Sequence, residues 1–156
     1  MASEQLVVFQ LKTEEYAIPI AQVKEIIRYN GATKLPNTPD YIDGIINLRD
    51  KVITVIDLAG KFLFATDKST DKQVLIVEAA GQEVGLVVDT VTEVIRLNEN
   101  EIEAADGLGY ANETIRSIGK AGKRLFIILD LNKLFIPEEL AIIQDTGLPE
   151  SIQLSS

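Results

Sequence analysis

An internal repeat is the feature of this sequence that most restricts its fold. Residues 6–30 align with residues 74–98 at an offset of 68, and six of the aligned pairs are identical. The identical pairs are Glu15 and Glu83, Val23 and Val91, Glu25 and Glu93, Ile27 and Ile95, Arg28 and Arg96, and Asn30 and Asn98. Residues 51–62 align with residues 124–135 at an offset of 73, so the second copy carries about five additional residues, which we place in the polar segment 98–110. The chain therefore consists of two related units of about 70 residues each.

Each unit begins with two apolar segments that predict a β-hairpin. In the first unit, "LVVFQLK" and "YAIPI" are rich in β-branched and aromatic residues, and in the second unit "VLIVEA" and "VGLVV" repeat the pattern. After each hairpin, residues 21–25 and 89–93 predict a single helical turn, and Thr90 and Glu93 have the spacing of a capping box. Further strands are predicted at about residues 41–49, 51–57, 111–119 and 124–130.

Short strands with small connections favour closed barrels, because closure hides the edges of a sheet. We therefore predict a mainly β protein made of two pseudo-symmetric five-stranded barrels, with short helical turns and a C-terminal helix. The first barrel is expected at about residues 14–68, completed by N- or C-terminal segments, and the second at 69–136. The helix is expected at 137–146, where Pro137 is a start signal, and residues 147–156 are expected to form a flexible tail. Duplication alone enlarges a core without specifying any chemistry.

Composition and charge exclude several classes of partner. The chain has 156 residues, of which 46% are hydrophobic and 25% charged, and no apolar run approaches the ~20 residues that span a bilayer. The N-terminal segment lacks the basic and apolar regions of a secretory signal, so we expect a cytoplasmic location. The net charge is −9, and residues 74–156 carry most of it, with six basic against fourteen acidic residues. A negative field repels phosphate backbones and anionic lipid, so we expect neither nucleic acid nor a membrane surface as a partner.

The chain contains no histidine and no cysteine, which removes the usual general base, the commonest metal ligand and the thiolate nucleophile. We therefore expect no catalytic activity, no metal and no cofactor. Carboxylates remain as candidates: Asp57 and Asp130 occupy matching positions after strands, where N-capping explains them without catalysis. The acidic segment 99–106 does not have the ligand spacing of a calcium-binding loop. The segment "GKAGKR" (119–124) lacks the spacing of a phosphate-binding loop and is interpreted as a basic hairpin turn.

The segments "VKEIIR" and "GIINLRD" place Glu25, Arg28 and Arg49 among aliphatic residues. Such a mixture is typical of a groove for an amphipathic helix, or of a surface that binds another barrel. The alternative is that Glu25 and Arg49 only pair with each other on the surface, which stabilises a protein by less than about 1 kcal/mol. The residues by themselves leave both interpretations open.

The segment "GIINLRDKVITVIDL" (44–58) resembles the CheW-like family, the bacterial chemotaxis coupling proteins. The resemblance extends in the same order through residues 15–26, 37–44, 85–95 and 125–135, so it covers most of the chain. It implies the CheW-like fold, in which two five-stranded SH3-like barrels form one molecule. It also implies a non-catalytic adaptor that couples transmembrane chemoreceptors to the histidine kinase CheA in chemotaxis signalling. The implied partners are the regulatory domain of CheA and the helical hairpin tip of the receptors, and the implied location is at membrane receptor arrays.

The same resemblance implies which residues contact the two partners. The family's Val-x-Glu-Ile and Asn-Leu-Arg motifs both fall in the first unit. The implied receptor-binding residues are Val23, Glu25, Ile26, Gly44, Asn47, Leu48, Arg49, Val91 and Val94. The implied kinase-binding surface lies on the strands around Val74 and Val87.

Three positions depart from the family pattern. Asp50 stands where glycine usually follows Asn-Leu-Arg, Thr54 stands where proline is common, and Ala59 stands where arginine often follows Asp-Leu. These three departures do not change the expected fold, but each could change which partner the protein binds. One alternative is the equivalent regulatory domain of a larger signalling protein, either a kinase or a coupler fused to a receiver, although the short segments at both ends favour a stand-alone protein. The other is an enzyme that uses carboxylates alone, with Asp57 or Asp130 beside another acid in a deep cleft.

Overall fold

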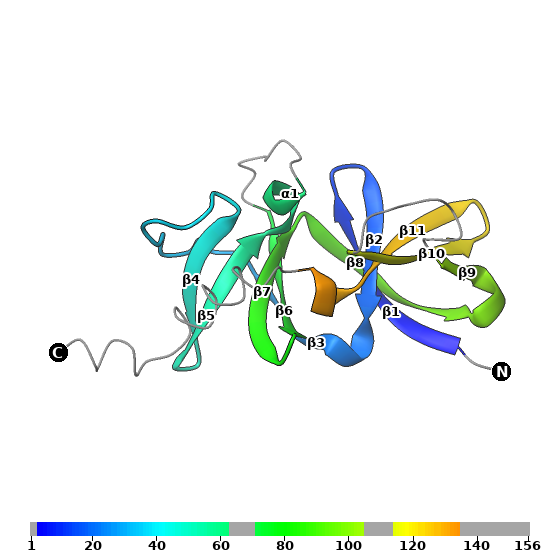
Figure 1. Cartoon of the computed structure of the whole chain (residues 1–156), viewed down its shortest axis with the longest axis horizontal. Helices are drawn as coiled ribbons and strands as arrows, with labels where there is room; N and C mark the ends of the chain where they lie inside the picture. Colours follow the sequence, from blue (N-terminus) through cyan, green and yellow to red (C-terminus); the bar gives the residue numbers. More distant parts are fainter. Residues whose placement is uncertain (1–2, 63–70, 105–113, 135–156) are drawn as a thin grey trace.

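The computed structural model describes residues 3–62, 71–104 and 114–134, and these residues form a mainly β fold (Figure 1). The prediction of a mainly β protein is therefore confirmed. The elements, in chain order, are β1 (Ser3–Leu11), β2 (Glu14–Pro19), the 3-10 turn η1 (Ile20–Gln22), β3 (Val23–Arg28), β4 (Ile42–Leu48), β5 (Lys51–Asp57), α1 (Leu58–Lys61), β6 (Gln73–Ala79), β7 (Gln82–Val88), β8 (Thr90–Asn98), the 3-10 turn η2 (Glu99–Glu101), β9 (Ile102–Ala104), β10 (Ile115–Ala121), β11 (Arg124–Leu129) and the 3-10 turn η4 (Leu131–Lys133). The helix predicted at 137–146 and the tail predicted at 147–156 lie outside the described residues. Within the described ranges, no helix has the length and hydropathy needed to cross a membrane.

The strands form two sheets, which build two lobes side by side (Figure 1). The six-stranded lobe has the order β8-β1-β2-β11-β10-β9, and the five-stranded lobe has the order β3-β6-β7-β5-β4. Two barrel-like lobes were predicted from the repeat. The sixth strand, β9, comes from the segment in which the second unit carries its additional residues.

Each lobe combines strands from both sequence units. The hairpin β1-β2 of the first unit joins β8 to β11 of the second, and the hairpin β6-β7 of the second unit joins β3 to β5 of the first. Two parallel pairings make this exchange, one between β11 and β2 and one between β5 and β7. The predicted ranges 14–68 and 69–136 therefore describe repeats of the sequence and not the membership of the sheets.

Three hydrophobic clusters among the described residues hold the lobes together. One fills the six-stranded lobe, one fills the five-stranded lobe, and the largest lies between them; we call this last cluster the shared core. Successive side chains of β6 alternate between two clusters: Val74 and Ile76 point into the five-stranded lobe, whereas Leu75 and Val77 join the shared core. Strands that are buried on both faces appear in a sequence as continuous apolar runs, which is the pattern of both predicted hairpins.

The first strand after each hairpin, β3 or β8, contains a β-bulge. In β8, Val8 of β1 faces Glu93 and Phe9 faces Val91, so Thr92 is the additional residue. Lys24 is the corresponding additional residue of β3. The helical turn predicted at 89–93 is therefore wrong, because these residues pair with β1 as an extended strand. The turn predicted at 21–25 is shorter than expected and ends at Gln22.

Candidate docking surface

The bulge in β3 places Glu25 opposite the tip of the β4-β5 hairpin. The Nη1 atom of Arg49 donates to Oε2 of Glu25 at 3.0 Å, and Nη2 donates to Oε1. This bidentate, charge-assisted ion pair lowers the pKa of the Glu25 carboxyl, mainly through the hydrogen bonds from Arg49. The Arg49 side chain nevertheless remains 71% exposed, so its guanidinium can still reach a partner. The pairing of Glu25 with Arg49, one of the two interpretations of the sequence, is present in the structure.

The β4-β5 turn presents Arg49 in an uncommon backbone conformation. Leu48 pairs with Lys51, and the two residues between them have φ values of 50° at Arg49 and 68° at Asp50. Two successive positive φ values are typical of a type I′ hairpin turn. The side-chain Oδ1 of Asn47 accepts a hydrogen bond from the Asp50 amide at 3.0 Å, which stabilises the turn. Asn47 therefore shapes the site by holding the turn that carries Arg49.

Replacing Asp50 by glycine is expected to stabilise the protein. Glycine adopts a φ of 68° without the Cβ strain that aspartate has there, so we expect a gain of about 0.5–1 kcal/mol in the free energy of unfolding. Urea denaturation would measure the change, with Asp50→Ala as the control that keeps the Cβ atom and gains nothing. Equal or lower stability for Asp50→Gly would mean that the aspartate side chain stabilises the turn more than its backbone strains it.

The remaining predicted receptor residues of the five-stranded lobe differ in exposure. Ile26 is 40% exposed, whereas Val23 packs against the shared core and Leu48 packs against the interior of its own lobe. Gly44 is buried at the seam where β4 meets Thr33. Gly44 therefore has a structural role in closing the lobe, whatever contact it makes with a partner.

A groove of about 720 Å3 opens along this seam of the five-stranded lobe. Its lining comes from β3, from the segment that follows it and from β4, with one residue each from β5 and β6. The lining residues are Ile27, Arg28, Tyr29, Asn30, Gly31, Ala32, Thr33, Ile45, Ile46, Asn47, Leu48, Val52 and Val74. Tyr29 donates a hydrogen bond to Asp43 at this place, and burial together with that bond raises the pKa of the tyrosine. Two of the predicted receptor residues, Asn47 and Leu48, thus border a groove with a mixed polar and apolar lining.

Val91 and Val94 lie on the other lobe, on β8. Val91 packs against the shared core, and Val94 is 50% exposed. Val94 occupies the position that aligns with Ile26 in the sequence repeat, so both lobes expose an aliphatic side chain at the same place. Seven of the nine predicted receptor residues therefore belong to the five-stranded lobe, and two belong to the six-stranded lobe.

The structure does not place the predicted kinase-binding residues on the surface. Val74 is 1% exposed and Val87 is 4% exposed, and both belong to the cluster that fills the five-stranded lobe. Val74 contributes to the groove only deep in its lining. Both side chains pack in the same cluster and present almost no area to a partner in this conformation, and their role in kinase binding stays a prediction. The reason for their burial is the alternation of β6 and β7, whose side chains are buried on both faces.

Comparison with known proteins identifies the family. The sequence pattern of the CheW-like domain matches residues 5–139. The chain belongs to the CheW-like family. It is 37% identical over 147 residues to the chemotaxis protein CheW of Klebsiella aerogenes, an alignment that covers 92% of this chain and 89% of that protein. It is 37% identical over 139 residues to the chemotaxis protein CheW of Bacillus subtilis, covering 86% of this chain and 88% of that protein.

A solved structure agrees with this assignment. The crystal structure of the scaffolding protein TtCheW from Thermoanaerobacter tengcongensis matches this fold with a TM-score of 0.79 and 40% sequence identity. The match covers 86% of this chain and 93% of TtCheW. The two-lobed arrangement is therefore shared with a CheW protein of known structure.

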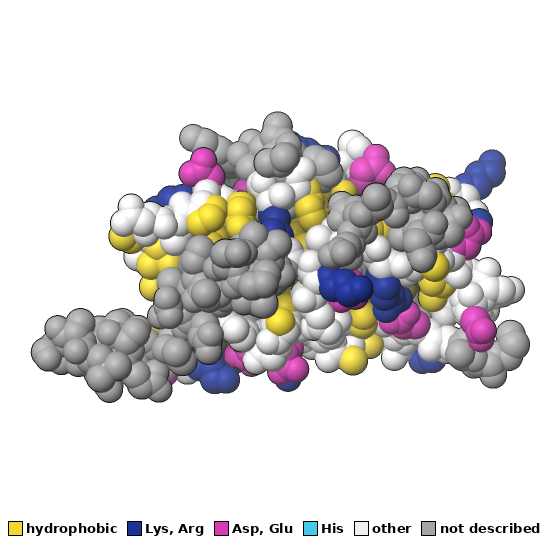
Figure 2. Space-filling model, viewed as in Figure 1, with side chains coloured by type: hydrophobic (Ala, Val, Ile, Leu, Met, Phe, Trp, Pro, Cys, Tyr) yellow, Lys and Arg dark blue, Asp and Glu magenta, His cyan; other side chains and the backbone are white. Residues whose placement is uncertain are grey.

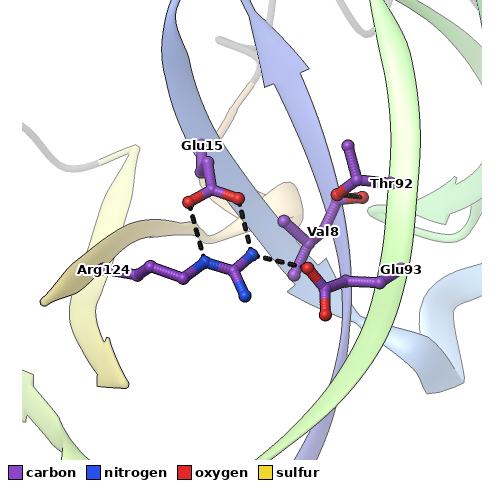
Figure 3. Close-up of polar contacts among 5 residues, drawn as sticks. All are labelled: Val8, Glu15, Thr92, Glu93 and Arg124. Carbon is purple, nitrogen blue, oxygen red and sulfur yellow. Dashed lines mark hydrogen bonds and ion pairs between the residues drawn. The ribbon is translucent and has the colours of Figure 1, made fainter. Parts of the chain in front are cut away.

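A second arginine of this CheW-like fold binds carboxylates, a contact that the sequence patterns did not predict (Figure 3). Arg124, at the start of β11, donates to both oxygens of Glu15 and to Oε2 of Glu93. The sequence predicted only that Arg124 belongs to a basic hairpin turn. The available signal was the repeat itself, because Glu15 and Glu93 belong to its identical pairs and Arg124 aligns with another cation, Lys51.

The two candidate catalytic carboxylates, Asp57 and Asp130, each precede a short helical turn. Asp130 accepts a hydrogen bond from the Asn132 amide at 3.0 Å and so caps η4, as the N-capping interpretation predicted. Asp57 precedes α1, and burial raises the pKa of its half-buried carboxyl, while the Gly60 amide and Lys72 act in the opposite direction. In the described parts of the CheW-like domain, no three His, Cys, Asp or Glu residues gather closely enough to hold a metal ion.

Proposed function

We propose that this CheW-like protein is a non-catalytic adaptor that couples chemoreceptors to the histidine kinase CheA. Two relatives that align over most of their length are named chemotaxis protein CheW, and the similar solved structure is titled as a scaffolding protein. The observation that carries the proposal is an arginine that is held in place by Glu25 and is still 71% exposed. Such an arginine can bind a carboxylate of a partner without first having to be ordered.

The proposed receptor contact includes two exposed aliphatic side chains, Ile26 and Val94, at the edge of the shared core. Ile26 pairs across the strands with Leu75, and Val94 pairs with Val7. Facing residues of antiparallel strands point to the same side, and both partners belong to the shared core. Ile26 and Val94 therefore lie at exposed margins of the shared core, where the apolar side chains of a receptor helix can pack.

One face of the molecule has the composition of a surface that binds another protein. On the face shown in Figure 2, basic and acidic side chains are interspersed and hydrophobic side chains lie between them. Interfaces between proteins combine apolar area with a polar rim in this way. The kinase is proposed to bind a different part of the surface, so that the adaptor holds receptor and kinase at the same time and links their states.

Replacing Arg49 by aspartate is expected to weaken receptor binding about 30-fold, because arginine anchors at interfaces contribute about 2 kcal/mol or more. The midpoint of thermal unfolding should change by only about 2–4 °C, since an exposed ion pair contributes at most about 1 kcal/mol. Calorimetric titration with a soluble hairpin fragment of a chemoreceptor tip measures the first quantity, and scanning calorimetry measures the second.

Lys51→Asp is the matched control for this experiment. It makes the same change of charge two residues away, at a side chain that is 70% exposed, and it should leave receptor affinity within about twofold. If Arg49→Asp unfolds the protein while affinity per folded molecule stays normal, Arg49 has only a structural role.

Co-sedimentation tests the coupling itself. The full chain, a receptor fragment and CheA are mixed, and each component is left out in turn. The proposal requires that this protein sediments with either partner alone and that kinase recruitment to the receptor increases when it is present. Binding to neither partner would contradict the proposed function.

A further inference from the structure

The six-stranded lobe repeats the structural motif that carries the proposed receptor contact. Residues 23–26 and residues 91–94 have the same order: a valine that packs against the shared core, a bulged residue, a glutamate and an exposed aliphatic residue. Both glutamates pair with an arginine from the β-hairpin on the other side of the lobe. The motif is therefore present twice in three dimensions as well as in the sequence.

The two copies differ in how their carboxylates are paired. The five-stranded lobe uses two cations: Arg49 pairs with Glu25, and Lys51 lies 3.6 Å from Glu83. In the six-stranded lobe the aligned carboxylates are Glu93 and Glu15, and one cation, Arg124, pairs with both.

Arg124 is engaged on several sides (Figure 3). Its Nη2 lies 2.7 Å from Oε1 of Glu15 and 2.5 Å from Oε2 of Glu93, and its Nε lies 3.2 Å from Oε2 of Glu15. The guanidinium carbon lies 4.7 Å from the ring centre of Phe126, a fully buried residue of the lobe interior. The Arg124 side chain is 43% exposed, compared with 71% for Arg49. It is therefore much less available to a partner than the arginine of the other lobe.

The position of Arg124 connects strands that are not neighbours in the sheet. It begins β11, which pairs with β2, yet it also reaches Glu93 on β8, on the far side of β1. The Thr92 hydroxyl donates to the Val8 carbonyl at 3.2 Å and holds the bulge on β1 beside this contact. Neighbouring side chains of a strand point to opposite faces, so fixing Glu93 also fixes the direction of Val94.

We infer that Arg124 is a positioning residue for receptor binding: it holds β8 through Glu93 so that Val94 lies at the margin of the shared core. The inference rests on the proposed function, because Val94 is a proposed receptor contact. The two lobes then use their arginines differently. Arg49 contacts the partner, whereas Arg124 stays within its own lobe and orients the apolar contact.

The test compares the full-length protein with Arg124→Ala in calorimetric titrations with the receptor hairpin fragment. We expect Arg124→Ala to weaken binding about fivefold, the equivalent of about 1 kcal/mol. Arg124→Lys keeps the charge but loses the forked geometry, so its affinity should lie between the two. Lys120→Ala is the matched control on the same hairpin, since Lys120 pairs with Glu103 of β9; it should bind like the wild type.

A double-mutant cycle with Val94→Ala separates positioning from a general loss of stability. If Arg124 acts through Val94, the receptor affinity of the double variant should be about that of whichever single variant has the lower affinity. Hydrogen exchange should show faster opening of residues 91–94 in Arg124→Ala, with the five-stranded lobe unchanged. Wild-type affinity in Arg124→Ala, additive effects in the cycle, or an equal loss in Lys120→Ala would each overturn the inference while leaving the proposed function standing. A wild-type protein that does not bind the receptor fragment would overturn both.

Discussion

Val87→Glu is expected to destabilise the five-stranded lobe rather than to remove one binding surface. Val87 is 4% exposed and belongs to the hydrophobic cluster inside that lobe. A carboxylate placed there has no partner, and an uncompensated buried charge costs about 3–5 kcal/mol. That is a large part of the roughly 5–15 kcal/mol by which domains are stable, so we expect the lobe to unfold at a much lower urea concentration.

Circular dichroism and urea denaturation measure this effect. Leu125→Glu is the control, because Leu125 is 61% exposed and a charge there stays in water; we expect it to change stability by about 0.5 kcal/mol or less. A Val87→Glu protein that keeps its native spectrum and loses only kinase binding would show that β7 can turn this side chain outwards. It would restore Val87 as a kinase contact.

Gly44→Ala is the second substitution with a large expected effect. Gly44 has a φ of 148°, and a Cβ atom built there would lie 2.1 Å from the carbonyl oxygen of Thr33. That oxygen accepts the Ile45 amide at 2.9 Å, and the Thr33 amide donates to Ile45 at 2.8 Å, so this pair of bonds closes the seam of the five-stranded lobe. We expect a loss of about 3 kcal/mol or more in the free energy of unfolding, from backbone strain and from the broken bridge.

Gly81→Ala separates the two causes. Gly81 also has a positive φ, of 80°, but a Cβ atom there would meet nothing within 4 Å. We expect only the backbone penalty of about 1–2 kcal/mol for this control. Equal losses in the two variants would contradict the role of the Thr33 contact, and hydrogen exchange at the Ile45 amide would show whether the seam opens in Gly44→Ala alone.

The local elements of the fold could be predicted because the apolar runs are long and occur twice. The assembly of the lobes could not, since the two units carry the same pattern and the pattern does not say which hairpin completes which lobe. The alternation of β6 side chains between two clusters could not be predicted from the sequence for a related reason. Val74 and Leu75 are both aliphatic, and only the structure shows that Val74 faces a lobe interior and Leu75 faces the shared core.

In the candidate site, too, contacts within one sequence unit were easier to predict than contacts between the two units. The pairing of Glu25 with Arg49 was one of two interpretations, since both residues stand among aliphatic neighbours. The strand at residues 90–98 was misread in part, because Thr90 and Glu93 have the spacing of a helix cap. Its partner β1, more than eighty residues earlier in the chain, holds it extended. Arg124 was missed because its two carboxylates come from strands far away in the sequence.

The exchange of hairpins between the lobes also restricts how the chain can fold during synthesis. The first lobe to be completed needs β7, which ends at Val88, and the other needs β11, which ends at Leu129. A nascent chain that has emerged only as far as the end of the first repeat therefore holds an apolar hairpin, β1-β2, whose neighbours β8 and β11 have not yet emerged. Contacts over such separations form slowly. A gene cut between the repeats would encode two fragments, and neither would contain all the strands of either lobe.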